Sequence, residues 1–406
     1  MSQDKRLIRN EGKNSEVIQR QNRLLVLRII REKKVISRVD LAKITGLKQA
    51  TITNIANELI DSEYIVEAGL IEGKNGRRVN GLKMNLDKMR ILVVRATSHY
   101  YAIGAYDIEG NCIQIEKIFW NVNESMQEKM NAISMDLQLY LSANSELRIL
   151  GIGILMSGNL NVSDSDEISC NFSSQMDFFQ SYFSEKYAFP VYVKNYSDMS
   201  AYFEWERQKS VNKELKTLVS IMISYSVDCA IVSEGRLIND GFNKGKGYGH
   251  VSIDIHGERC ECGNRGCVNQ YVSVGAVKKR VGELKGQYPD SQTQPDWNIR
   301  NIINAFLARE PLAVAVFEQE AEYLGIIVTN LINQFNPDEV IIGDEIPNDK
   351  TFLEMVRSSV KKYVSEKTFN DVDIRFFTEK RKTENDVGMK GLCLYITNDQ
   401  LKHMEL

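Results

Sequence analysis

The sequence predicts a two-part protein, with a small basic helical domain at the N-terminus followed by a larger α/β body. A chain of 406 residues exceeds what one hydrophobic core usually organises. Residues 1–90 carry 19 Lys and Arg against 11 Asp and Glu, a net +8, whereas the rest carries 32 against 43, a net −11. The hydrophobic pattern also changes near residue 88, from helical spacing to alternating strands and helices. We therefore expect domains at 1–88 and 89–406, joined through the short segment Asn85–Met89.

Composition excludes a disordered or membrane-spanning chain. Apolar residues make up 43% and charged residues 26%, both ordinary for a globular protein. The longest apolar stretch, Ile149–Met156, is far shorter than the ~18 residues of a membrane span. The polar N-terminus resembles no signal peptide, so we expect a cytoplasmic protein without a membrane partner. The basic N-terminal domain predicts an anionic partner, and nucleic acid ranks ahead of a membrane surface.

The basic domain has the pattern of a helix-turn-helix. Apolar residues recur at helical spacing over 17–33, and Ser37 can cap a helix over 38–45 that ends at Gly46. A second helix follows, with Ile52, Ile55, Leu59 and Ile60 on one face. Its first turns carry polar side chains suited to base edges in a DNA major groove: Lys48, Gln49, Thr51, Thr53 and Asn54.

Two predicted strands over 64–85 follow this helix pair and enclose a turn rich in Gly and Arg. Lys74, Arg77 and Arg78 in and beside that turn can contact phosphates or the minor groove. The whole unit therefore predicts a winged helix-turn-helix that binds duplex DNA. The alternative is a small helical protein-binding module whose basic residues are merely solvated.

The body alternates strands with helices. Three successive strands form a predicted meander, and two later blocks of strand followed by helix predict a two-lobed α/β architecture. The expected strands are 91–97, 100–110, 112–120, 148–156, 190–195 and 339–345, with a hairpin over 217–240. The expected helices are 123–144, 198–209 and 321–335.

Three of the seven cysteines cluster in one short loop, within 250–267. Cys260, Cys262 and Cys267 place three thiolates within reach of one ion, and His250 is the best fourth ligand. His256 competes for that place. Four N and S ligands predict a structural zinc site, which would stabilise a loop that lacks its own core. The alternative is a set of free thiols in a turn.

The stretch HVSIDIHGERCECGNRGC (250–267) resembles the zinc-loop signature of the ROK family of repressors, open-reading-frame proteins and sugar kinases. Residues 38–69 resemble the winged helix of the repressor branch, and 321–346 resemble the family's late helix and strand. The resemblance implies an N-terminal winged helix-turn-helix joined to an actin-like, ribonuclease-H-like two-lobed ROK body. It also implies a ligand cleft between the lobes, bound zinc, and a homodimer or larger homo-oligomer.

Departures from the kinase pattern predict that this chain is not an enzyme. The phosphate loop of the kinases corresponds to Val94–Thr97, which lacks its Asp and has Arg95 where a glycine lets the backbone approach phosphate. Asp228 stands in the second nucleotide element, and Asp344 replaces a glycine near the adenosine side. Tyr196 stands where the kinases carry the Asp that acts as base, and a neutral tyrosine is a poor base at pH 7.

The resemblance also implies which residues line the effector site. Asn195 and His250 are retained, whereas the two positions that carry Glu in the family are Gly247 and Asn269. Gly158 corresponds to a loop beside the sugar, and Tyr196 offers a face for stacking. We expect a cleft that responds to a sugar or related effector; a cleft that binds nothing is the alternative.

Together these features predict a DNA-binding transcriptional regulator, chiefly a repressor of sugar-utilisation genes. A homodimer or tetramer would place two winged helices on a palindromic operator. The alternatives are a sugar kinase with an appended DNA-binding head, a regulator controlled by a protein partner, and an activator.

Overall fold

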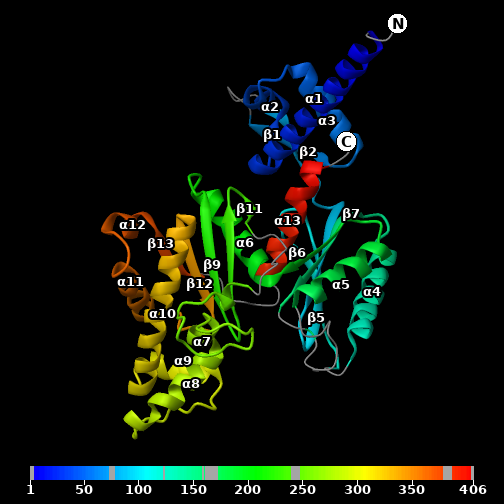
Figure 1. Ribbon diagram of the computed structural model, residues 1–406. Helices are drawn as coiled ribbons and strands as arrows, with labels where there is room; N and C mark the ends of the chain where they lie inside the picture. Colours follow the sequence, from blue (N-terminus) through cyan, green and yellow to red (C-terminus); the bar gives the residue numbers. More distant parts are fainter. Residues whose placement is uncertain are drawn as a thin grey trace.

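The computed structural model of the chain describes residues 4–72, 78–121, 124–157, 160, 172–238, 247–377 and 386–403. It consists of a small head and, beneath it, two lobes that are each built on a five-stranded sheet (Figure 1). Among the helices of these described residues, none is long and apolar enough to cross a membrane.

The head contains three helices and an antiparallel sheet in the order β1-β3-β2. Its order of elements is the predicted helix, turn, helix and strand pair, but the turn of the wing (73–77) lies outside the described residues. Strand β1 was not predicted, because a two-residue strand leaves no periodic pattern. The elements are α1 (Asp4–Lys33), β1 (Ile36–Ser37), α2 (Arg38–Thr45), α3 (Gln49–Asp61), β2 (Ile65–Glu72) and β3 (Arg78–Met84).

Local sequence signals explain the helix pair. The Ser37 hydroxyl accepts a hydrogen bond from the Asp40 amide (3.1 Å) and so caps α2. Gly46 ends α2 in the left-handed conformation, with φ of 74°. Ile52 and Leu59 are buried on the inner face of α3, which leaves the opposite face in solvent.

The first lobe is a mixed sheet in the order β6-β5-β4-β7-β8. The predicted meander is present as antiparallel β4, β5 and β6, while β7 and β8 continue the sheet in parallel. Val94 and Ile154 pack in one core cluster with residues of α4 and α5, whereas Val93 and Leu155 pack in another with residues of the last helix. The elements are β4 (Met89–Ala96), β5 (Tyr100–Tyr106), β6 (Cys112–Phe119), α4 (Met126–Ala143), β7 (Arg148–Met156), α5 (Phe172–Lys186) and β8 (Val191–Asn195).

The second lobe has the order β11-β10-β9-β12-β13, with α10 and α11 over one face and α6 over the other. Its helices and strands are α6 (Tyr196–Val211), β9 (Thr217–Ile223), β10 (Val227–Ser233), β11 (Arg236–Leu237), η2 (Tyr248–His250), α7 (Asn269–Val272), α8 (Val274–Leu284), η3 (Lys285–Gln287), α9 (Ile299–Leu307), α10 (Pro311–Phe335), β12 (Glu339–Asp344), α11 (Lys350–Lys361), α12 (Glu366–Asp371) and β13 (Asp373–Phe376).

Two helices, α6 and α13 (Val387–His403), pack against each other between the lobes. Helix α13 follows the second lobe in sequence but lies on the sheet of the first, and its C-terminal end reaches the head (Figure 1). The helices approach closely at Gly391, where an added Cβ atom would lie 1.9 Å from the Met199 carbonyl oxygen. Only glycine permits this contact.

The head packs directly against the body. One hydrophobic cluster runs through both, from Leu27 and Met84 to Ile108. The predicted linker is itself packed, since Asn85 is only 7% exposed and donates to the Glu63 carbonyl oxygen (3.0 Å).

Candidate DNA-binding head, cysteine loop and inter-lobe cleft

Helix α3 presents a polar surface to solvent from its start. Lys48, Gln49, Thr53 and Asn54 are exposed, and Thr51 is half-buried. Among the described residues, no side-chain hydrogen bond engages the Gln49 or Asn54 amide, so both are free to pair with other groups. Such amides match the donor and acceptor pattern of adenine in the major groove. The geometry of α3 therefore suits base recognition.

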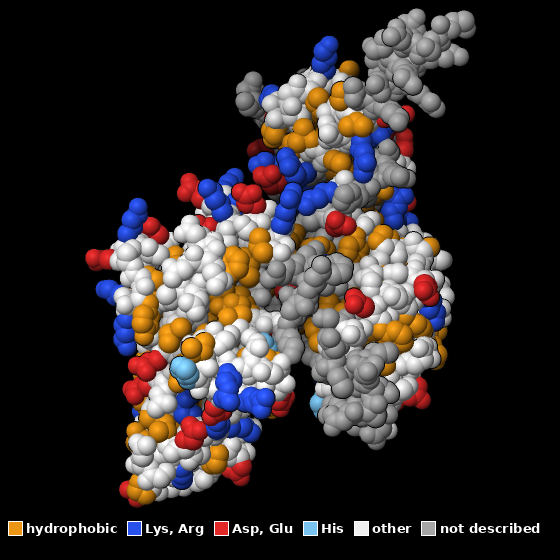
Figure 2. Space-filling view, viewed as in Figure 1, with side chains coloured by type: hydrophobic (Ala, Val, Ile, Leu, Met, Phe, Trp, Pro, Cys, Tyr) orange, Lys and Arg blue, Asp and Glu red, His pale blue; other side chains and the backbone are white. Residues whose placement is uncertain are grey.

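The strand pair that follows this helix adds positive charge to the head. Arg78 is exposed at the first position of β3, while Lys74 and Arg77 lie outside the described residues. Lys and Arg side chains lie on the head and where it meets the body (Figure 2). An exposed guanidinium group such as that of Arg78 suits a contact to the phosphate backbone.

The cysteine loop brings four potential ligands together. One ligand atom each from His250, Cys260, Cys262 and Cys267 lies within 4.8 Å of all the others. The Cys260 Sγ–His250 Nδ1 distance is 3.4 Å and the Cys262 Sγ–Cys267 Sγ distance is 3.6 Å. Tetrahedral zinc with Zn–S bonds of about 2.3 Å requires sulfur–sulfur separations of about 3.8 Å. The cluster thus has the size of a tetrahedral metal site, whereas the competitor His256 is exposed outside it.

Tight turns make this cluster possible. The Gly263 amide donates to the Cys260 carbonyl oxygen (2.9 Å), and the Cys260 amide donates to that of Asn264 (2.8 Å). Gly266 has φ of 63°, and a Cβ atom there would lie 1.7 Å from the Asp254 carbonyl oxygen. Gly263 and Gly266 therefore allow the chain to reverse tightly around the cluster.

The chemistry of the thiols favours a bound cation. Burial, together with hydrogen bonds to the neighbouring thiols of Cys262 and Cys260, raises the pKa of Cys267 to about 12. A thiol in that environment keeps its proton unless a nearby positive charge stabilises the thiolate. A divalent ion held by three thiolates and one imidazole supplies that charge, so the residues fit a metal.

The predicted effector residues come from both lobes. The carboxyl ends of β4, β7 and β8 lie side by side, with Ala96 paired to Met156 and Met156 to Asn195. Ligands of open α/β sheets bind at such strand ends. Asn195 there uses its side-chain oxygen to accept from the Ser197 amide (3.2 Å) and so caps α6. Gly158 lies outside the described residues.

Tyr196 differs from its expected role as a stacking platform. Its side chain is only 6% exposed, and the Arg95 guanidinium lies 4.3 Å from the ring centroid. Cation–π contact and burial therefore engage the ring within the protein. Little of it is left for a sugar.

His250 and Asn269 lie beside β10 of the second lobe. The Asn269 side-chain oxygen accepts from the Val227 amide at the start of β10 (2.8 Å). Tyr248, in the same short helix as His250, and Asp198 of α6 both interact electrostatically with Cys229 in β10. The start of α6 and the segment that carries His250 therefore meet at this strand.

Acidic and bulky groups occupy the positions of the nucleotide-binding elements. Arg95 forms an ion pair with the buried carboxylate of Asp386, just before α13. Burial and the nearby Asp344 raise the pKa of Asp228 to about 6. Asp344 has φ of 84°, a left-handed backbone conformation that favours glycine. The backbone thus retains a glycine geometry, while the side chain adds a charge that repels phosphate.

Sequence reasoning missed the partners of these residues. Nothing local marks Asp386, which is 291 residues from Arg95. Nor does any motif mark Asn398 of α13, whose side chain accepts from Arg31 of the head (2.5 Å). Comparison of related sequences for paired substitutions is the signal that could reveal them.

The sequence matches known transcriptional regulators. A model of the ROK family matches residues 92–398. The chain is 26% identical to the xylose repressor of Caldicellulosiruptor bescii, over 97% of this chain and 99% of that protein. It is 22% identical to the DNA-binding transcriptional repressor Mlc of Escherichia coli, over 83% and 84% of the two chains. Residues 1–88 form more than a fifth of the chain, so the first of these alignments includes most of the head.

Solved structures share the fold. A crystal structure of a ROK family transcriptional regulator, a homolog of E. coli Mlc, superposes with a TM-score of 0.75 at 24% identity and covers 95% of this chain and 100% of that one. A ROK hexokinase from Thermus thermophilus gives a TM-score of 0.57 at 17% identity, covering 75% and 98%. These likenesses confirm the predicted head and the actin-like two-lobed body.

Proposed function

The chain belongs to the ROK family, and we propose that within this family it is a DNA-binding transcriptional repressor that controls genes of sugar utilisation. The observation that carries the proposal is the exposed polar start of α3 in a head that the repressor relatives share. Helix α3 would enter the major groove through Lys48, Gln49, Thr51, Thr53 and Asn54, and the wing would contact the backbone through Lys74, Arg77 and Arg78.

We propose that the protein binds its operator as a homodimer, with a tetramer as the larger form. Two-fold symmetry would match a palindromic operator whose half-sites are about one helical turn, or a multiple of it, apart. Repression then depends on how the two heads are placed relative to each other.

The inter-lobe cleft is the proposed effector site. Asn195, His250 and Asn269 can contribute polar contacts to a sugar hydroxyl, together with the backbone at Gly158. Tyr196 supports this site from within the core and offers the sugar little surface. An effector shifts the heads only if it binds one lobe arrangement better than the other.

We propose that zinc occupies the cysteine loop through His250, Cys260, Cys262 and Cys267. Four such ligands leave no open position, which is typical of a structural site. The ion would hold the loop that carries His250 and precedes Asn269, and so link the cleft to the fold of the second lobe.

We also propose that the protein does not transfer phosphate, although its body shares the fold of a hexokinase. Arg95 stands in the phosphate loop, Asp228 and Asp344 add negative charge, and Tyr196 replaces the catalytic base. A neutral tyrosine at the position of the base is a poor acceptor for the proton of a sugar hydroxyl at pH 7.

Selection from a pool of random DNA duplexes tests the proposed function. The purified chain should enrich an inverted repeat. A thermal-shift screen of mono- and disaccharides and their phosphates, with and without the enriched duplex, should then identify the effector class. Absence of any enriched repeat would refute DNA recognition, and turnover of ATP with a hexose would instead support a kinase. A repeat without any sugar response would favour control by a protein partner.

A further inference from the structure

We propose that Asn398 is the positioning residue of the DNA-binding head: its single amide ties head helix α1 to one helix of each lobe. The side-chain oxygen of Asn398 accepts from Arg31 Nη1 of α1 (2.5 Å). Its side-chain nitrogen donates to the Tyr202 hydroxyl (2.7 Å) and to Glu206 Oε1 (2.5 Å), both on α6. The inference rests on the proposed function, because it concerns how the heads are placed on an operator.

Helix α13, which carries Asn398, belongs to the first lobe. The Tyr192 hydroxyl of β8 donates to Asp399 Oδ2 (2.6 Å), and Arg95 of β4 pairs with Asp386 at the other end of the helix. Leu392 and Ile396 are buried against the same sheet. A movement of the first lobe therefore carries α13 with it.

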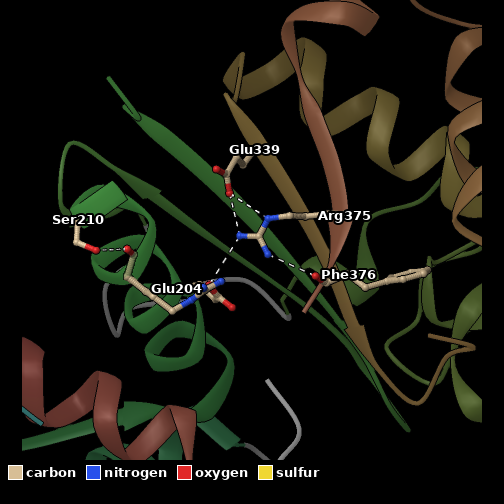
Figure 3. A network of polar contacts seen from close by, with 6 residues as sticks. Glu204, Ser210, Glu339, Arg375 and Phe376 are labelled. Carbon is tan, nitrogen blue, oxygen red and sulfur yellow. Dashed lines mark hydrogen bonds and ion pairs between the residues drawn. The ribbon is translucent and has the colours of Figure 1, made fainter. Parts of the chain in front are cut away.

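The middle of α6 belongs to the second lobe. Figure 3 shows Arg375 of β13 lying between Glu339 of β12 and Glu204 of α6, with N–O distances of 2.9 Å and 3.7 Å. Glu204 is 1% exposed and also pairs with Arg207 (2.8 Å). A charge network of this kind is expensive to break once its members are buried, so α6 moves with the second sheet.

A close contact between α6 and α13 lies away from Asn398, so a rotation about it displaces the groups around Asn398. This contact, Gly391 against Met199, lies seven residues before Asn398, or about 10 Å along α13. A small rotation of one lobe about that contact would displace Tyr202 and Glu206 relative to Asn398. Since Arg31 is bound to the same amide, the head would follow.

An asparagine side chain at position 398 is well suited to join α13 to α1 and α6. Only an amide side chain offers one acceptor and two donors, and all of them are engaged here. Two of the three bonds involve charged partners, Arg31 and Glu206, and such bonds are shorter and stronger than neutral ones. An ion pair between head and body, Lys34 with Glu109 (2.8 Å), lies at the surface, with the Lys34 side chain 62% exposed. Substitution of Lys34 therefore serves as the control for substitution of Asn398.

The test is half-site spacing in DNA selection by the full chain. The wild type should prefer one spacing, and Asn398→Leu, which keeps the side-chain volume but removes all three bonds, should select the same half-site with relaxed spacing. Discrimination against a duplex whose spacing differs by one base pair should fall by about tenfold, the order expected from losing a hydrogen bond to a charged group. Glu206→Ala should relax spacing in the same direction, and Lys34→Gln should not.

An unchanged half-site sequence and a cooperative thermal transition would show that each variant head is folded. Wild-type spacing in Asn398→Leu would overturn the assignment while leaving the repressor proposal intact, and so would equal relaxation in Lys34→Gln. Wild-type spacing in Glu206→Ala would overturn the role of α6. If the wild type enriches no inverted repeat, the proposed function fails and the assignment fails with it.

Discussion

At the scale of single residues, Glu320 of α10 places an ionisable carboxyl group in the interior of the second lobe. Its side chain is fully buried, and neither carboxylate oxygen has a hydrogen-bond partner among the described residues. Burial raises the pKa of Glu320 to about 8, although the nearby Arg280 acts in the opposite direction. The folded protein therefore holds a proton on Glu320 that the unfolded chain releases above its ordinary pKa of 4.5.

This buried carboxyl group predicts a pH-dependent gain in stability for Glu320→Gln. Between pH 4.5 and 8 the folded wild type binds more protons than the unfolded chain, so its stability falls as pH rises and levels off above 8. The variant has no carboxyl proton to release on unfolding. Its free energy of unfolding should therefore exceed that of the wild type by a margin that grows to about 2 to 4 kcal/mol by pH 8. Urea unfolding at pH 5, 7 and 8.5 measures it. An advantage that is constant with pH would contradict the buried proton.

Single substitutions can also distinguish the proposed base contacts from the proposed phosphate contacts. Gln49→Ala removes a group proposed to face base edges and should change the preferred half-site sequence. Arg78→Ala removes a proposed phosphate contact, so it should weaken binding to all duplexes and reduce the salt slope by about one. Titration at several salt concentrations distinguishes them. A sequence-specific effect of Arg78→Ala would contradict the wing assignment.

At the scale of elements, we expect the cysteine loop to depend on the proposed metal. Its surface is open, with Ile255 76% exposed, so few apolar contacts stabilise it. Cys262→Ser should lower metal affinity by more than about 100-fold, because even partners outside the ligand set contribute 10- to 100-fold. It should also lower the Tm. Metal content and thermal unfolding measure both.

Cys112→Ser is the matched control for the loop, because it removes a thiol outside the cluster. It should bind one metal ion per chain and melt as the wild type does. Equal metal content in Cys262→Ser and Cys112→Ser would refute the four-ligand site.

The close contact between α6 and α13 leads to a second prediction about these elements. Gly391→Ala forces a Cβ atom against the Met199 carbonyl oxygen and should destabilise the chain by about 1–3 kcal/mol. Gly286→Ala is the control, because no atom lies within 4 Å of its added Cβ. Chemical denaturation compares the two. Equal stability of both variants would show that the helices can separate at little cost.

At the scale of the whole molecule, the sequence predicts local features well. The Ser37 cap, the turn at Gly46, the meander and the cysteine loop all depend on residues close together in the chain. Their physics is short-range, so one sequence contains the signal.

Long-range pairing is the part that the sequence does not predict. The ring of Tyr196 contacts Arg95, whose partner Asp386 directly precedes the final helix. The joint at Asn398 combines residues from the head and from both helices between the lobes. No spacing or periodicity encodes contacts across hundreds of residues, so these features require the folded chain.

The whole molecule therefore combines a head shaped to read DNA with a kinase-like body whose phosphate-binding positions carry Arg95, Asp228 and Asp344. Helices α6 and α13 connect the two. This arrangement predicts sequence-specific DNA binding rather than catalysis.

Fluorescence anisotropy of the purified chain with its selected inverted repeat measures this binding. The protein should bind the repeat at least about 1,000-fold more tightly than a scrambled duplex, and affinity should fall steeply with salt. Equal affinity for both duplexes, or no binding to either, would contradict the account.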